Sequence, residues 1–234
     1  MPLTHPTERD HARSPRKEEG ERIGGGSFLF EIPAPGWDIS RVIQIRMKLF
    51  RNEPPQTPAM REAAARVFVY GSLMSRPVLL ALLGRVPRAD PAVLCGFERR
   101  RVAGEVFPAL VARASAPRLR GLVFSELSLA ERRIFDEFED DAYQKQTVRA
   151  SVVAGVGDPF GWAMREDEPD EALRSSTAEL DAEAYVWADA ATGLDAGAWS
   201  ARRDFLPHEA GYVRMCEEFA RSPEVAALRS GGAG

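Results

Sequence analysis

The sequence has few of the side chains on which most metal sites and nucleophilic active sites depend. It contains two cysteines and three histidines in 234 residues. Cys95 and Cys216 stand far apart in apolar surroundings, which favours buried free thiols over a disulfide or a catalytic thiol. His5 and His11 belong to a charged N-terminal stretch, and His208 lies where a helix is expected to begin, a position typical of capping or surface roles. These residues offer no ligand cluster at usable spacing, so the sequence predicts no metal site.

Long hydrophobic runs and an excess of one charge are also missing. No apolar run approaches the roughly 20 residues of a membrane-spanning helix. The net charge is −4 with both signs interspersed, which gives no indication of a nucleic-acid-binding surface. The hydrophobic fraction of 44% is ordinary and sufficient for a core. We therefore expect a soluble, cytoplasmic protein that binds neither nucleic acid nor membrane, and the sequence leaves its oligomeric state open.

The N-terminal part differs in composition from the rest. Its first 26 residues are charged, contain Pro and Gly, and have too little apolar content for a core. No apolar segment of a secretory signal follows the start, and the acidic residues disfavour an organellar transit peptide. Ile43–Leu49 alternates as a half-buried strand does, a basic amphipathic helix being the weaker alternative, and Asn52–Pro58 has the composition of a linker. The predicted regions are a disordered tail (1–26), an N-terminal extension with possible strands and a Pro-rich linker (27–65), a core domain (66–222) and a C-terminal tail (223–234).

Short strands predominate in the core domain. Strands are predicted at Val67–Tyr70, Val93–Val102, Phe107–Ala112, Leu119–Phe124, Thr147–Val153 and Ala182–Trp187. One helix is expected to begin after Ser75 and end at Gly84, and a second to begin at the capping box of Ser128 and Glu131 and run to about Phe138. A last helix carries Tyr212, Val213, Cys216 and Phe219 on one side. This order predicts an α+β fold, a small mixed or antiparallel β-barrel with a few flanking helices, rather than a doubly wound sheet.

The first strand ends in a turn suited to an anionic ligand. Gly71 lets a ligand approach the backbone without a Cβ in the way, and the following helix N-terminus adds partial positive charge. Free N–H groups there suit a carboxylate or a developing oxyanion. From these residues alone, an ordinary strand–helix turn with a buried Tyr70 remains the other interpretation. A nucleophilic role for Ser72 is not supported, because the G-x-S-x-G pattern is absent.

Carboxylates crowd the end of the second helix. Glu139 lies beside the buried face formed by Phe135 and Phe138, whereas Asp136, Glu137 and Asp140 are expected to turn toward solvent. Partial burial, neighbouring like charges and the helix C-terminus should all raise the pKa of Glu139, as a general base for an ammonium group requires. A solvated acidic helix end is the alternative interpretation.

Several blocks, in order, resemble the γ-glutamylcyclotransferase superfamily, and its AIG2-like branch in particular. Residues 67–73 (VFVYGSL) are similar to the Y-G-S-L substrate loop of that family, and residues 104–111 (GEVFPALV) and 135–140 (FDEFED) to later blocks. The resemblance covers roughly residues 66–219. Phe107 departs from it where a tyrosine is common, and residues 155–176, with an acidic run, look like an insertion near the mouth of the site.

The resemblance implies a reaction in which the α-amine of a γ-glutamyl amide attacks its own γ-carbonyl, giving 5-oxoproline and a free amine. It implies Glu139 as the catalytic base, a small-molecule γ-glutamyl substrate, and no metal or cofactor. The substrate-binding residues that it implies are Tyr70, Gly71, Ser72, Leu73, Met74, Ser75 and Tyr143. Two other classes of function stay open: a non-catalytic binding or interaction module on the same fold, and a γ-glutamyl acyltransferase or hydrolase.

Overall fold

The computed structural model describes residues 66–165, 176–190 and 192–231. The chain divides into two units, Met1–Pro33 and Ala34–Gly234, and all the described residues belong to the second. The predicted tail (1–26), the extension (27–65) and the acidic run at 166–170 lie outside the described residues.

Five strands close into a barrel in the order β1-β5-β2-β6-β7. Their bounds are β1 Val67–Val69, β2 Arg88–Leu94, β5 Leu119–Ser125, β6 Tyr143–Val153 and β7 Ser176–Trp187. The pairs within the barrel are antiparallel, except that β1 runs parallel to β7 where Val67 meets Glu183. The prediction of a small mixed β-barrel in an α+β fold is confirmed.

Side-chain alternation gives the barrel two apolar clusters. Phe68 and Tyr70 join one cluster, whose residues other than Tyr70 all lie in strands and include four alanines from β2, β6 and β7. These small residues leave room inside the barrel for the Phe68 ring. Gly121 is needed for the same reason, because a Cβ there would lie 2.5 Å from Cζ of Phe68 and 2.4 Å from the backbone oxygen of Val69. Val67 and Val69 point the other way, into the cluster under the helices.

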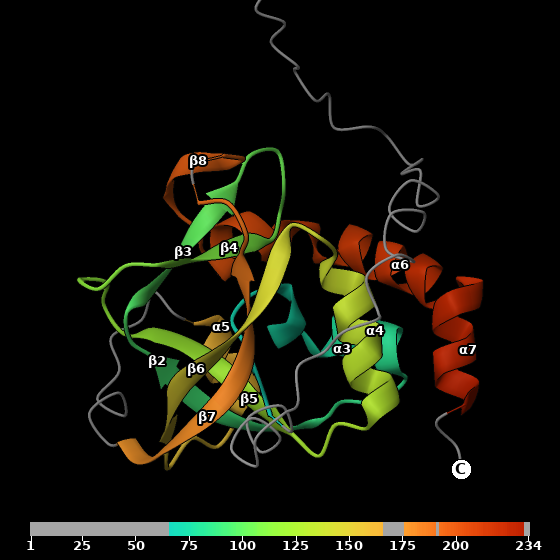
Figure 1. Ribbon diagram of the computed structural model, residues 1–234, viewed down its shortest axis with the longest axis horizontal. Coiled ribbons are helices and arrows are strands. Elements are labelled where there is room, and N and C mark those ends of the chain that lie inside the picture. Colours follow the sequence, from blue (N-terminus) through green and yellow to red (C-terminus); the bar gives the residue numbers. More distant parts are fainter. Residues whose placement is uncertain (1–65, 166–175, 191, 232–234) are drawn as a thin grey trace, which may run out of the picture. The chain divides into compact units, whose positions relative to one another are not determined.

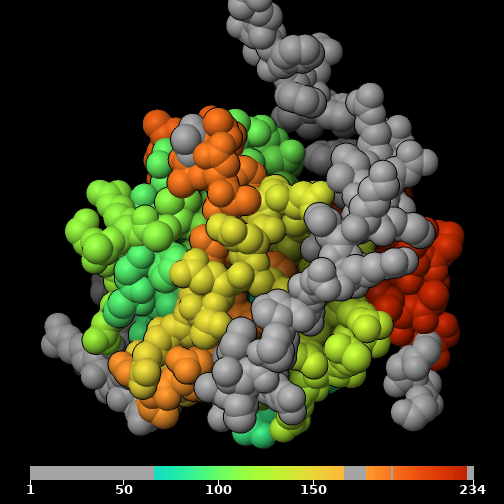
Figure 2. Space-filling view, viewed as in Figure 1, coloured from blue at the N-terminus to red at the C-terminus, as the bar shows by residue number. Residues whose placement is uncertain are grey.

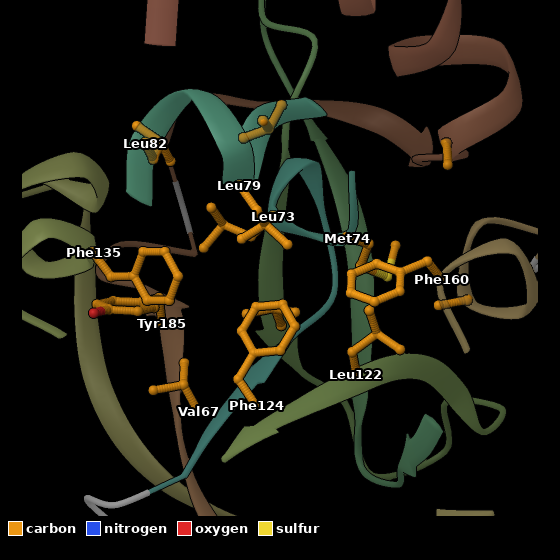
Figure 3. Close-up of a cluster of buried hydrophobic side chains, with 14 of the residues drawn as sticks. Val67, Leu73, Met74, Leu79, Leu82, Leu122, Phe124, Phe135, Phe160 and Tyr185 are labelled. Carbon is orange, nitrogen blue, oxygen red and sulfur yellow. The ribbon is translucent and has the colours of Figure 1, made fainter. Parts of the chain in front are cut away.

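Helices cover that second cluster (Figure 1). Their bounds are η2 Ser72–Met74, α3 Arg76–Leu83, α4 Leu129–Glu139, α5 Pro159–Met164, η4 Ala201–Phe205, η5 Leu206–His208, α6 Glu209–Ala220 and α7 Pro223–Gly231. The caps predicted from sequence are present: Ser75 accepts from the N–H of Val78, Gly84 is left-handed at φ 76°, and Ser128 and Glu131 form a capping box. Figure 3 shows Phe124 and Leu122 of β5 beside Phe160 of α5 and Leu73 in this cluster.

A separate three-stranded sheet has the order β4-β3-β8. It consists of β3 Phe97–Val102, β4 Pro108–Ala112 and β8 Leu194–Ala198. The prediction of one strand over Val93–Val102 was therefore wrong, because Gly96 at φ 80° turns the chain from the barrel into this sheet. The prediction that Cys95 is buried was wrong for the same reason: it stands exposed in the turn, whereas Cys216 is buried.

Two segments carry more structure than the sequence indicated. The stretch from residue 223, expected to be a tail, forms α7, which buries Val225 against the helical cluster. The first part of the expected insertion at 155–176 forms α5, whose Phe160 and Trp162 are also buried there. Among the described residues, no helix has the length and apolar character needed to cross a membrane.

Candidate functional site

The predicted ligand turn lies where β1 ends. Strand β1 leads through Tyr70 and Gly71 into η2, whose two turn hydrogen bonds run from the N–H of Met74 to the Gly71 oxygen and from the N–H of Ser75 to the Ser72 oxygen. Within the described residues, the N–H groups of Ser72 and Leu73 donate to no protein acceptor, although both residues are buried. Buried N–H groups are normally paired. The turn therefore holds backbone donors that a ligand oxygen can use.

Gly71 is required by packing rather than by ligand approach. A Cβ at this position would lie 2.7 Å from Cδ and 2.8 Å from Cγ of Pro108, the first residue of β4. The Pro108 carbonyl in turn accepts a hydrogen bond of 2.9 Å from the Tyr143 hydroxyl. The reason given above for this glycine, open space for a ligand, was therefore wrong. The glycine lets β4 and Tyr143 close against the turn.

Glu139 is the last residue of α4 and its carboxyl lies in poorly solvated surroundings. Burial, with a further contribution from the charge of Asp140, raises the pKa of Glu139 to about 8 from an ordinary 4.5. In the described part of the chain, no hydrogen bond or ion pair reaches this carboxyl. The residue keeps some exposed surface, so a ligand can still approach it. The predicted rise in pKa is confirmed, and its main cause is burial.

All four tyrosines of the chain surround Glu139. Burial is the main cause of the raised pKa of Tyr70, Tyr143, Tyr185 and Tyr212, and the charge of Glu139 raises each of them further. They come from the end of β1, the start of β6, the end of β7 and α6, so four distant segments meet at one carboxyl.

Three of the four hydroxyl protons are directed away from Glu139. Tyr70 donates to the backbone oxygen of Tyr185 at 2.5 Å, Tyr143 to Pro108 as described, and Tyr185 to Oδ1 of Asp136 at 2.7 Å. Tyr212 shares a hydrogen bond of 3.2 Å with Oγ of Ser72. Hydrogen bonds donated to a carboxylate stabilise its ionised form and lower its pKa. These three hydroxyl protons are therefore not available to stabilise the ionised form of Glu139, whose pKa is raised mainly by burial.

Asp136 does not turn toward solvent as predicted. Its side chain is 16% exposed, and its two oxygens accept from the Tyr185 hydroxyl and, at 3.2 Å, from Nζ of Lys145. Lys145 and Tyr185 are cross-strand neighbours in β6 and β7. Figure 2 shows β6, in yellow, crossing the viewed face of the molecule. Lys145 of this strand is exposed. The Lys145–Asp136 pair thus links the surface to Tyr185.

The remaining predicted site residues differ in what their side chains can do. Leu73 and Met74 are buried in the helical cluster, so only their backbone can face a ligand. The hydroxyl of Ser75 accepts from the Val78 N–H and donates to Oε1 of Glu209 at 2.6 Å, which joins α3 to α6. Ser75 therefore caps a helix. Tyr70, Ser72 and Tyr143 keep polar groups in the neighbourhood of Glu139.

Comparison with known proteins identifies the family. A family model described as "Gamma-glutamyl cyclotransferase, AIG2-like" matches residues 67–201, more than half of the chain. The chain belongs to this family. AIG2-like protein D of Arabidopsis thaliana is 32% identical over 154 residues, which are 66% of this chain and 88% of that protein. AIG2-like protein C of the same plant is 34% identical over 126 residues, which are 54% of this chain and 60% of that protein.

Solved structures similar to this AIG2-like chain include proteins from a plant and a yeast. The solution structure of an Arabidopsis thaliana protein is 25% identical, with 74% of this chain and 90% of that one covered and a TM-score of 0.44. The crystal structure of a yeast γ-glutamyl cyclotransferase specific to glutathione is 14% identical, with 70% and 93% covered and a TM-score of 0.38.

Sequence reasoning missed several residues of this AIG2-like site. Tyr185 and Tyr212 were placed only on apolar faces, although a buried tyrosine needs a partner for its hydroxyl, and that need was the available signal. The guanidinium group of Arg99, which is buried in β3, donates a hydrogen bond of 3.1 Å to the backbone oxygen of Tyr70. This bond fixes the backbone at the start of the turn. Glu105 lies in the connection before β4, next to this site, and the sequence indicated only a turn there. No group of His, Cys, Asp and Glu in the described ranges is arranged to hold a metal ion.

Proposed function

We propose that this chain is a γ-glutamylcyclotransferase that converts a γ-glutamyl amide to 5-oxoproline and a free amine, with Glu139 as general base. The observation that carries the proposal is a desolvated carboxyl of raised pKa, Glu139, at the end of α4 in a fold whose β1 turn offers unused backbone N–H groups. Membership of the family supports the same reaction.

The proton transfer is well matched at Glu139. The α-ammonium group of a peptide has an ordinary pKa of about 7.7–8.0, and the free α-carboxylate of a γ-glutamyl substrate raises that value. The pKa of Glu139 is raised to about 8. A proton therefore passes from the substrate's ammonium group to this carboxylate at a much lower cost in free energy than to a carboxylate of ordinary pKa. Binding of the ammonium group also favours the ionised form of Glu139, because an opposite charge at close range stabilises the carboxylate.

The bond changes then need only positioning and oxyanion stabilisation. The neutral α-nitrogen attacks the γ-carbonyl carbon, a C–N bond forms, and the carbonyl oxygen becomes an oxyanion. We assign the N–H groups of Ser72 and Leu73 as its donors. As the bond to the leaving nitrogen breaks, Glu139 returns its proton to that nitrogen. The ring nitrogen, positively charged after the attack, loses its second proton through the same carboxylate to the released amine, which leaves as an ammonium ion with Glu139 ionised again. The attack is intramolecular, so holding the folded substrate supplies much of the rate acceleration.

The test is production of 5-oxoproline from a panel of γ-glutamyl amides by the purified full chain, with Glu139→Gln as the variant. The amide keeps the shape of the side chain but accepts no proton at neutral pH, so turnover should fall by roughly 10²–10⁴-fold. Substrate binding, measured by calorimetry, should persist. Glu137→Gln is the matched control on the same helix and should change turnover little.

The rival functions give different results in the same assay. A binding module binds an amide and forms no 5-oxoproline. An acyltransferase or hydrolase also accepts amides whose α-amine is blocked, which a cyclotransferase cannot use. Ser72→Ala should weaken binding by about 0.5–1.5 kcal/mol through one lost hydrogen bond. Complete loss of turnover in Ser72→Ala with binding intact would indicate a covalent serine mechanism instead.

A further inference from the structure

Glu105 lies in the short connection from β3 to β4, and that connection is fixed next to the site. Its N–H donates to the Val102 oxygen at 3.1 Å. The carbonyl of Val106, the next residue, accepts from Nε1 of Trp199 at 2.7 Å. Pro108, at the start of β4, packs on Gly71 as described above. The backbone on both sides of Glu105 is therefore held in place by contacts with the turn and with the segment before η4.

The carboxyl of Glu105 has no cation beside it, unlike those of two other glutamates in the described part of the chain. Glu98 pairs with Arg113 at 2.7 Å, and Glu131 pairs with Arg85. Among residues 66–165, 176–190 and 192–231, no side chain forms an ion pair or hydrogen bond with the Glu105 carboxyl. The residue is half-buried, and burial raises its pKa to about 7. A partly desolvated carboxyl without a partner gains free energy when a cation binds beside it.

Tyr212 connects this carboxyl to the reaction site. The charges of Glu139 and of Glu105 both act on the Tyr212 hydroxyl, which shares its hydrogen bond with Ser72. The pKa of Glu139 responds to burial and to the charge of Asp140, and Glu105 is not among its causes. The Phe107 ring, two residues after Glu105, lies 6.5 Å from the Tyr212 ring. Glu105 thus stands one side chain beyond the site of the glutamyl group.

We propose, resting on the cyclotransferase function above, that Glu105 is a specificity residue that contacts a positively charged group on the leaving amine. The glutamyl group is held by the β1 turn and Glu139, so the part of the substrate that extends past Tyr212 is the amine to be released. An unpaired carboxylate there attracts a second ammonium group and repels a carboxylate. The preferred substrates are then γ-glutamyl monoamides of diamines, and γ-glutamyl amino acids and peptides, which release an amine bearing a carboxylate, are disfavoured.

The experiment uses three L-glutamate γ-amides of matched length, made from 1,4-diaminobutane, butylamine and 4-aminobutanoate. They carry a positive, a neutral and a negative leaving group and are otherwise alike. The wild type should cyclise the diaminobutane amide with a kcat/KM about 10- to 100-fold above that of the butylamide, the range of a charge-assisted hydrogen bond. The aminobutanoate amide should be the poorest substrate. The preference should shrink as salt concentration rises.

Glu105→Gln should abolish the difference between the positive and neutral amides and leave the butylamide rate within about threefold of wild type. Glu105→Asp keeps the charge and should keep the order of preference, so it decides the matter if Glu105→Gln does not fold. Glu98→Gln, the same change on the same sheet, should leave the preference unchanged. Equal rates for all three amides in the wild type, or an equal loss for all three in Glu105→Gln, overturns the proposal.

The same reagents separate this proposal from the proposed function. Cyclisation without charge preference leaves the cyclotransferase function standing and overturns the role of Glu105. If no amide yields 5-oxoproline, the cyclotransferase function fails, and calorimetry with the diaminobutane amide still tests Glu105. Tighter binding to the wild type than to Glu105→Gln then supports the cation contact, and equal binding overturns it.

Discussion

At Glu139 the burial that suits catalysis also makes the stability of the fold depend on pH. Its pKa is about 8 in the folded chain against an ordinary 4.5. Between these values the folded chain holds a proton that the unfolded chain releases, so the free energy of unfolding falls as pH rises from about 4.5 to 8 and is level above. The contribution of this group is fully present below pH 4.5 and is lost at high pH.

Glu139→Gln should therefore remove most of this pH dependence. The variant should be more stable than the wild type by a few kcal/mol at pH 8.5 and nearly equal to it at pH 4.5. Urea unfolding at several pH values between these limits measures the difference. Glu137→Gln should follow the wild-type curve. Parallel curves for the wild type and Glu139→Gln would show that the pKa of Glu139 is ordinary in the folded chain.

A second residue-scale prediction concerns Gly71. Gly71→Ala places a Cβ against the Pro108 ring, which must shift and take with it the acceptor of the Tyr143 hydroxyl. Overpacking of this kind costs about 1–3 kcal/mol of stability, and 5-oxoproline formation should fall at least tenfold because the turn itself moves. Thermal melting and a rate assay measure the two effects. Gly157→Ala, with open space around its Cβ, is the control. Unchanged activity in Gly71→Ala would place the reaction away from this turn.

Among single residues, the raised pKa of Glu139 could be predicted because its signals are local. Its position beside Phe135 and Phe138 and the adjacent Asp140 are visible within five residues. The role of Asp136 was invisible, because its partner Tyr185 is 49 residues away in the chain. The unpaired state of Glu105 was invisible for the same reason, since pairing depends on which distant cations the fold brings near.

At the scale of elements, prediction succeeded where the boundary signals lie within a few residues. Helices α3 and α4 begin and end at the caps read from Ser75, Gly84 and Ser128. Strands β2 and β3 were merged, because only two residues, Cys95 and Gly96, separate them in the chain. Helix α7 was missed, because it is short and only its Val225 is fully buried. The burial of one valine depends on contacts with distant parts of the chain, which the local sequence does not show.

Helix α7 should stabilise the fold through that residue. Val225→Ala removes two methyl groups from a side chain that is 1% exposed, which should cost about 1–3 kcal/mol. Its effect on kcat/KM should be small, because α7 contributes none of the residues around Glu139. Leu80→Ala, at a leucine that is 51% exposed on α3, is the control and should cost much less. Equal losses in the two variants would mean that α7 is not packed in solution.

At the scale of the whole molecule, the sequence predicted the class of fold but not its connections. The number and shortness of the strands favoured a barrel, yet closure depends on β1 lying between β5 and β7, which are far from it in the chain. The barrel also sets the site, since the hydrogen bond from Tyr70 to Tyr185 spans 115 residues. No local pattern specifies such a pairing. The family resemblance supplied the arrangement that periodicity alone could not.

The barrel closes within the described residues, and this predicts where the part of the chain that folds by itself begins. The family match starts at residue 67, and β1 is fixed on both sides, with the Arg66 oxygen accepting from the Glu183 N–H at 2.9 Å. A chain beginning at Met60 should therefore unfold cooperatively and retain wild-type kcat/KM. A chain beginning at Tyr70 lacks β1, leaves β5 and β7 with open edges, and should aggregate. Size-exclusion chromatography and thermal melting distinguish the outcomes, and aggregation of the Met60 chain would show that residues 1–59 contribute to the core.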